Sequence, residues 1–137
     1  MNMSNKILED ASKCFACGPN NPIGLKINYT LDDQNRCVGY FEANENHVGY
    51  ENTVHGGIIF TTLDDVMANV LYLNQIKAYT AKCDIRYRQP LKTKQKVKLI
   101  GWIVSEKRRL VTLKGEAVLC NNHKVIADCE AKFMLVE

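Results

Sequence analysis

Hydrophobic and polar residues alternate along several segments of the chain, and a period of two predicts strands with one buried face. The clearest example runs from Tyr79 to Tyr87, with charged residues at positions 82, 84 and 86 and Pro90 just beyond its end. The same pattern predicts five further strands, at residues 25–31, 37–43, 95–105, 110–120 and 124–136. The first two of these are expected to pair as a hairpin, and the last three to form an antiparallel meander.

One segment has the helical period instead. After His55-Gly56-Gly57, apolar residues lie on one stripe of a helix that should end near Asn74; they are Ile59, Leu63, Val66, Met67 and Val70. Only this helix is available to cover so much sheet, so a single sheet is expected to curl around it in an α+β architecture. The 137 residues contain no repeat or linker and are interpreted as one domain, residues 1–137.

The two glycines at the helix start are the first candidate for chemistry. Free N–H groups of Gly56 and Gly57, helped by the helix dipole, can stabilise an oxyanion. Two consecutive glycines at a helix start carry an entropic cost, so their presence needs a reason. Close approach of a ligand or of another backbone is the favoured reason, and a simple turn is the alternative. His55 either transfers protons or fixes the loop through a ring hydrogen bond, and the second role is favoured.

Two neighbouring aspartates follow on the helix. A helical wheel places Asp64 at the border of the apolar face and Asp65 on the polar face, beside Asn69 and Tyr72. A partly desolvated carboxylate has a raised pKa and greater reactivity, whereas one on a polar face stays solvated. Asp64 is therefore expected to act as base or nucleophile, the alternative being that both aspartates only solvate the helix exterior.

Composition and charge narrow the classes of partner. Eighteen Lys and Arg against fifteen Asp and Glu give a formal charge of +3, which excludes a dedicated nucleic-acid binder and suits an anionic small molecule. The polar N-terminus and the lack of a bilayer-length apolar run predict a soluble, cytoplasmic protein without a membrane partner. In that compartment the six cysteines are expected to be reduced.

Cys14 and Cys17 have the C-x-x-C spacing of half a zinc site or of a redox pair. A closed zinc site needs two more ligands, and Cys120 with His123 is the only comparable pair. The redox motif normally lies in a βαβ context, which this end of the chain lacks. Neither a metal ion nor another cofactor is expected.

Lysines at positions 92, 94, 96 and 98 would line one face of an extended segment, and residues 107–109 form a basic turn. Such rows usually protect a sheet edge from pairing. The other interpretation is a docking site for the phosphates of a phosphorylated carrier.

Taken together, six stretches of the chain resemble the hotdog-fold acyl-CoA thioesterases, in the branch similar to phenylacetyl-CoA thioesterase and the thioesterase-superfamily proteins. The stretches are Cys14–Leu25, His47–Tyr50, Val54–Gly57, Leu63–Met67, Tyr79–Ala81 and Arg86–Pro90. The resemblance implies a curled antiparallel sheet of about six strands wrapped around one long central helix. It also implies a homodimer that commonly forms a dimer of dimers, with the active site at the dimer interface.

The resemblance implies catalytic roles for three residues. Asp64 lies where the family carries its catalytic carboxylate, and Gly56 matches the backbone donor to the thioester carbonyl oxygen. Thr80 lies where relatives use a hydroxyl to hold the attacking water or the aspartate. The implied reaction is hydrolysis of an acyl-CoA thioester to free acid and coenzyme A.

The predicted substrate-binding residues are His55, Gly57, Asn52 and Asp65. Some relatives carry an asparagine six residues before the histidine, where this chain has Gly49; Asn52 or His47 would supply that polar contact instead. Asp65 stands where close relatives often have glutamate. The Cys14/Cys17 pair belongs to the pattern of one sub-branch, where it looks structural.

Two other functions remain open alongside acyl-CoA hydrolysis. One is a non-catalytic acyl-CoA binding protein or sensor of the same fold. The other is a hydratase or dehydratase that uses His55 as its base. The sequence leaves open the acyl group, the base or nucleophile role of Asp64, and coenzyme A against a carrier protein.

Overall fold

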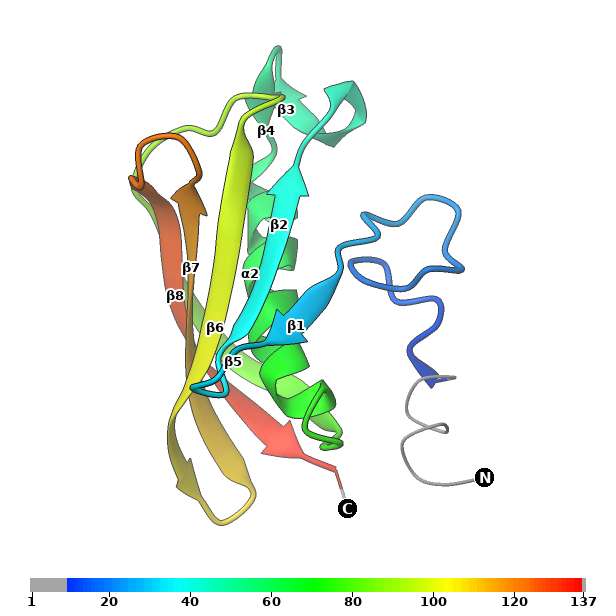
Figure 1. Cartoon of the computed structure of the whole chain (residues 1–137), viewed down its shortest axis with the longest axis vertical. Coiled ribbons are helices and arrows are strands. Elements are labelled where there is room, and N and C mark those ends of the chain that lie inside the picture. The colour runs from blue at the N-terminus through cyan, green and yellow to red at the C-terminus, as the bar shows by residue number, and fades with distance from the viewer. Residues whose placement is uncertain (1–9, 137) are drawn as a thin grey trace.

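A six-stranded antiparallel sheet curls around one long helix, α2 (Gly56–Tyr72), in the computed structural model, which describes residues 10–136 (Figure 1). The strand order is β1-β2-β6-β7-β8-β5, so β1 and β5 are the two edges. The bounds are β1 (Tyr29–Leu31), β2 (Cys37–Glu42), β5 (Ala78–Tyr87), β6 (Lys96–Lys107), β7 (Leu110–Leu119) and β8 (Val125–Leu135). This arrangement confirms the α+β architecture expected from the sequence.

The core lies between the inner face of α2 and the concave face of the sheet. Leu63, Val66, Met67 and Val70 of the predicted apolar stripe are completely buried there. Helix and sheet approach closely at Gly101, where an added Cβ would lie 2.9 Å from the Val66 carbonyl oxygen. Backbone contact at this point therefore sets the distance between α2 and β6.

The first predicted strand is shorter than expected. Only Tyr29–Leu31 joins the sheet, because Lys26 adopts a left-handed backbone conformation with φ of 55°. The amides of Leu25 and Ile27 instead donate to carbonyl oxygens of the N-terminal segment, at 2.8 and 2.9 Å. The alternating pattern here reflects packing under that segment as well as pairing in the sheet.

A small two-stranded sheet, which the hydrophobic pattern did not predict, precedes α2. It consists of β3 (Val48–Tyr50) and β4 (Thr53–Val54), and the 3-10 helix η1 (Glu45–His47) leads into it. The His55 amide donates to the His47 carbonyl oxygen at 2.9 Å. These short elements therefore fix the position from which α2 begins.

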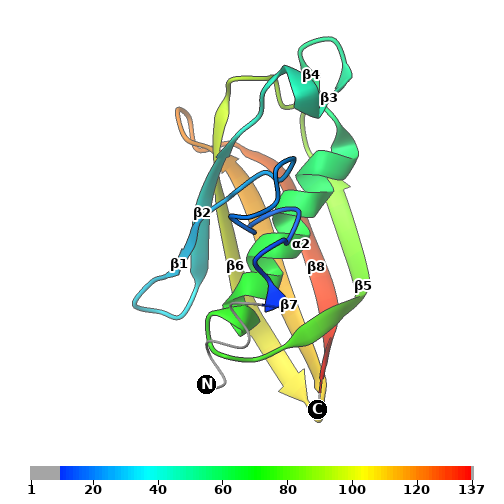
Figure 2. The same ribbon diagram turned by 90° about the vertical axis from the view of Figure 1, so that its right-hand side faces the viewer.

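The N-terminal segment, residues 10–28, crosses the side of α2 that the sheet leaves uncovered (Figure 2). Ala16 and Ile27 are buried by this packing. The helix is thus covered on two sides, by the sheet and by residues from the beginning of the chain. Within residues 10–136, no helix is both long and apolar enough to cross a bilayer.

Candidate active site

His55 caps the N-terminus of α2. Its Nδ1 accepts a hydrogen bond from the Gly57 amide at 2.8 Å, so the ring proton is on Nε2. A Cβ at Gly57 would lie 3.0 Å from that Nδ1, which explains why glycine stands there. The predicted loop-fixing role of His55 is confirmed, and the Gly57 amide is occupied within the chain.

Gly56 differs from Gly57 in having an amide that remains free. Among residues 10–136 its N–H has no hydrogen-bond partner, while its carbonyl oxygen accepts from Tyr87 Oη at 2.8 Å. Neither glycine has a positive φ, so no left-handed turn requires them. A Cβ at Gly56 would meet Tyr87 Oη at 3.5 Å, an ordinary contact. Packing within the chain therefore leaves space beside the Gly56 amide.

An apolar groove of about 350 Å³ opens beside Gly56. Side chains from β4, α2 and the loop after β5 line it, including Val54, Ile59 and Leu91. The phenol of Tyr87 lies at the same groove. Sequence reasoning did not identify Tyr87 as part of this region, because its contact with Gly56 spans 31 residues of chain.

Asp64 lies on the side of α2 that faces β5, and its carboxylate is half-buried. Thr80 Oγ1, on β5, donates a hydrogen bond to Asp64 Oδ1 at 2.6 Å. Burial raises the pKa of the Asp64 carboxyl, and the Thr80 hydrogen bond partly offsets that rise. The partial desolvation predicted for Asp64 is confirmed. Of the two partners that the resemblance implied for Thr80, the attacking water or the aspartate, the hydroxyl contacts the aspartate.

The solvated environment predicted for Asp65 is wrong. Asp65 is only 8% exposed, and the Sγ atoms of Cys14 and Cys17 each lie 3.6 Å from its Oδ1. The wheel described the helix alone, whereas residues 10–28 cover the face that it assigned to solvent. Asp65 therefore contacts the N-terminal segment, whereas Asp64 contacts Thr80 on β5.

The other polar residues weighed in this region occupy the turn before α2. Asn52 is exposed between β3 and β4 with φ of 59°, and its carbonyl oxygen accepts from the Thr93 amide at 3.1 Å. His47 Nδ1 accepts from the Asn44 amide at 3.1 Å, so that nitrogen is used within the chain. Asn52 does not line the groove at Gly56, whereas Gln89, in the loop after β5, does.

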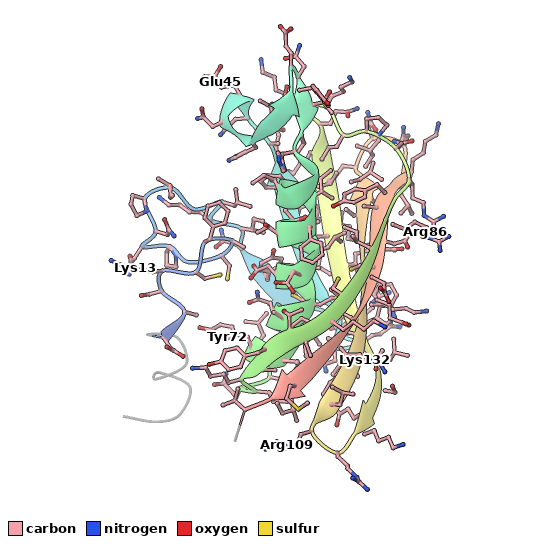
Figure 3. The ribbon with its side chains drawn as sticks, turned by 180° about the vertical axis from the view of Figure 1, so that it is seen from behind. Lys13, Glu45, Tyr72, Arg86, Arg109 and Lys132 are labelled. Carbon is pink, nitrogen blue, oxygen red and sulfur yellow. The ribbon has the colours of Figure 1, made fainter. Side chains whose placement is uncertain are left out.

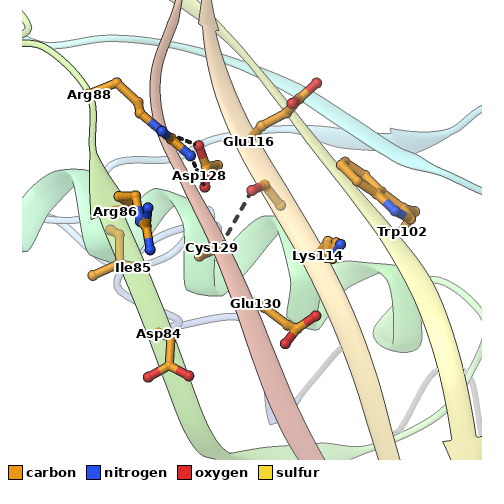
Figure 4. Close-up of a pocket in the computed structure, with 11 residues that line it drawn as sticks. Asp84, Ile85, Arg86, Arg88, Trp102, Lys114, Glu116, Asp128, Cys129 and Glu130 are labelled. Atoms are coloured by element: carbon orange, nitrogen blue, oxygen red, sulfur yellow. Dashed lines mark hydrogen bonds and ion pairs between the residues drawn. The ribbon is translucent and has the colours of Figure 1, made fainter.

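A larger hollow, about 530 Å³, lies on the convex face of the sheet, with α2 behind the strands (Figure 4). It is lined mainly by charged side chains, and Arg88 pairs there with Asp128 at 2.7 Å. Because the sheet separates this hollow from α2, it does not include Asp64 or Gly56. Its polar lining also makes it a poor site for an acyl chain.

The predicted lysine row is interrupted. Lys94 has φ of 69° in the loop before β6, so an extended segment does not include it. Only Lys96 and Lys98 share a face of β6, and Lys96 Nζ lies 5.2 Å from the centre of the Tyr40 ring. Neither lysine lies in the groove at Gly56.

This architecture is the hotdog fold, and comparisons with known proteins agree with it. The model of the thioesterase superfamily matches residues 51–126, more than half of the chain, and the chain belongs to that superfamily. The match includes the helix start, Asp64 and Thr80. No curated protein sequence matches the chain.

Solved structures share the fold at low sequence identity. A thioesterase superfamily protein has a TM-score of 0.83 and 21% identity, over 90% of this chain and 60% of that protein. Zebrafish thioesterase superfamily member 2 has a TM-score of 0.77 and 16% identity, over 99% and 100% of the two chains. A Streptococcus mutans UA159 protein bound to acetyl-CoA has a TM-score of 0.73 and 17% identity, over 80% and 88%. The chain thus spans about 60% of the length of the first relative.

Proposed function

We propose that this protein is an acyl-CoA thioesterase that hydrolyses a thioester to a free acid and coenzyme A. The observation that carries the proposal is the half-buried Asp64 carboxylate held by Thr80, on a helix whose first amide is free and opens into an apolar groove. Membership of the thioesterase superfamily supports it. So does the shared fold of the Streptococcus mutans protein bound to acetyl-CoA.

In the proposed reaction the Gly56 amide donates a hydrogen bond to the thioester carbonyl oxygen. Asp64 takes a proton from water as the water oxygen adds to the carbonyl carbon, and the carbon–sulfur bond then breaks. The thiolate of coenzyme A leaves without a strong general acid, because it is a good leaving group. Direct attack by the Asp64 carboxylate, followed by hydrolysis of the anhydride, is the alternative route. Thr80 positions the carboxylate in either case.

The site requires two copies of the chain. Gly56 and Asp64 lie eight residues apart on one helix, which separates them by about 12 Å along its axis. A single thioester carbonyl cannot contact both groups across that distance. We therefore propose a homodimer in which Asp64 of one copy acts opposite Gly56 of the other, and a pair of such dimers as the larger assembly.

The edge strand β5 offers a way to form that dimer. It lies beside α2 at the edge of the sheet (Figure 3), and it carries both contacts of the site. Thr80, near its start, bonds to Asp64, and Tyr87, at its end, bonds to Gly56. Two β5 strands can pair antiparallel in a register that places Thr80 of each copy opposite Tyr87 of the other. That register would bring each Asp64 to the opposite copy's Gly56.

The variant Asp64→Asn tests the assignment. It is expected to fold and to lose turnover by a hundredfold or more, because the amide cannot accept the proton from water. The measurement is thiol release from a panel of aromatic, medium-chain and short branched acyl-CoA substrates, with circular dichroism as the check on folding. The matched control is Asp33→Asn, an exposed aspartate in the turn between β1 and β2. Wild-type turnover in Asp64→Asn would contradict the proposed mechanism.

The same panel separates hydrolysis from the other two functions. Saturable acyl-CoA binding without thiol release would identify a binding protein or sensor. Hydration of an enoyl-CoA would identify a hydratase; against it, His55 Nδ1 already accepts the Gly57 amide. A cytoplasmic location is also proposed, supported by six cysteines that are all free.

A further inference from the structure

Three side chains that can bind a metal ion converge beneath the N-terminal segment. Cys14 and Cys17 come from a turn of that segment, and Asp65 comes from α2. One atom from each side chain, a sulfur or a carboxylate oxygen, lies within 4.8 Å of the other two. Sequence reasoning missed this set because it compared the cysteine pair only with Cys120 and His123, whereas Asp65 follows Cys17 by 48 residues.

The spacing of these atoms fits a tetrahedral zinc ion. With zinc–sulfur and zinc–oxygen distances of about 2.3 and 2.0 Å, a sulfur and an oxygen ligand lie roughly 3.5 Å apart. Cys14 Sγ and Cys17 Sγ each lie 3.6 Å from Asp65 Oδ1. Little movement would be needed to place all three atoms around one ion.

The turn that carries the cysteines is tightly built. The Gly18 amide donates to the Cys14 carbonyl oxygen at 2.8 Å, and a Cβ at Gly18 would lie 2.3 Å from the Cys14 nitrogen. The turn therefore holds both cysteines in defined positions against α2.

Two buried oxygen atoms lie beside the cysteines. Asp65 Oδ2 and Tyr29 Oη make no hydrogen bond of good geometry within residues 10–136, and each is near enough to interact with the other. Asp65 is more than nine-tenths buried. An unsatisfied buried oxygen is costly, and a cation beside it would remove that cost.

We propose that Cys14, Cys17 and Asp65 bind one zinc ion, which fastens the N-terminal segment to α2. Two sulfurs and one carboxylate oxygen favour a borderline-soft ion such as zinc over calcium or magnesium. Water or the Tyr29 hydroxyl would be the fourth ligand. Because its three ligands join the N-terminal segment to α2 and include neither Asp64 nor Gly56, the role of the ion is structural. The proposal is independent of the thioesterase assignment and replaces the expectation that no metal is bound.

Metal content of the purified full-length chain tests the proposal. We expect about one zinc per chain after reconstitution and desalting, and loss of that zinc in Cys17→Ser and Asp65→Asn. The matched controls are Cys120→Ser, an exposed cysteine, and Asp64→Asn, the adjacent carboxylate; both should keep the ion. A chain that holds no zinc after reconstitution, or an Asp65→Asn variant that holds it as well as wild type, would overturn the proposal.

Cobalt substitution tests the same site without any variant. Cobalt bound by two thiolates in a tetrahedral site gives a sulfur-to-metal charge-transfer band and intense visible d–d bands, and zinc should displace both. Chelation of the ion should speed proteolysis within residues 10–28 while leaving the sheet resistant. A cobalt spectrum without the charge-transfer band would show that no thiolate is bound and would contradict the assignment.

Discussion

Replacing Gly56 with proline should remove the oxyanion donor and leave the fold intact. Gly56 is the first residue of α2, the helical position where proline is most readily accepted. The preceding residue, His55, has φ of −59° and ψ of 133°, the extended conformation that a following proline requires. Because the Gly56 N–H has no partner within residues 10–136, its removal breaks no hydrogen bond there.

The expected changes in stability and in turnover have opposite signs. Proline in a compatible conformation restricts the unfolded chain and stabilises by about 0.4–1 kcal/mol. Loss of one oxyanion donor lowers kcat by roughly a hundredfold to a thousandfold, about 2.7–4 kcal/mol in activation free energy. Gly56→Pro should therefore unfold at the same or a higher urea concentration than wild type, with almost no thiol release. A variant that lost thiol release because its structure was damaged would instead unfold at a lower urea concentration than wild type.

Gly56→Ala is the matched control, since it keeps the amide and its Cβ would make only an ordinary contact with Tyr87. It should retain most of the wild-type turnover. Full turnover in folded Gly56→Pro would refute the role of this amide. An unfolded Gly56→Pro would refute the argument that the helix start accepts proline.

Mixing Gly56→Pro with Asp64→Asn tests whether the site is shared between copies. In a symmetric dimer, random exchange makes about half of the dimers mixed, and each mixed dimer has one intact site of two. Turnover should then rise to about a quarter of wild type. Activity of the mixture that only equals the average of the two variants would contradict the shared site.

Three further variants test single contacts. Thr80→Val removes the hydrogen bond to Asp64 and should lower kcat about tenfold to a hundredfold. Thr80→Ser keeps the hydroxyl and should have a kcat close to that of wild type. Equal kcat values in the two variants would rule out the positioning role of Thr80. His55→Ala removes the cap of α2 and should cost about 1 kcal/mol in urea unfolding; an unchanged midpoint would show that the cap does not stabilise the helix. Gly101→Ala forces a Cβ against the Val66 carbonyl oxygen and should lower the free energy of unfolding by about 1–3 kcal/mol. Its control is Gly49→Ala, whose Cβ would have its nearest contact at 3.5 Å and should change that free energy by no more than about 0.5 kcal/mol. Equal losses in the two variants would contradict the close approach of helix and sheet.

Patterns with a local cause were predictable from the sequence. The periods of two and 3.6 residues reflect which face of each element is buried, so the long strands and α2 were located to within a few residues. The cap at His55 was predictable too, since its bond spans only two residues. Asp64 was identified because it lies at the border of the apolar stripe on α2, and that part of the helix faces β5.

Features that depend on distant segments were not predictable in this way. The helical wheel placed Asp65 in solvent because the sequence of α2 alone cannot show that Cys14 and Cys17 pack against this residue. The left-handed conformation of Lys26 is likewise set by bonds to the N-terminal segment, and it shortens β1. Both errors arise from one segment, which contacts the helix across about fifty residues of chain.

Within residues 10–136, β8 is the only strand paired with β5, so one side of this ten-residue strand presents bare amides and carbonyls. Any extended polypeptide can adhere to such a strand, although the charged side chains of Lys82 and Asp84 discourage it. In the proposed dimer a second copy covers this edge, so a newly synthesised chain is exposed to mispairing until the dimer forms.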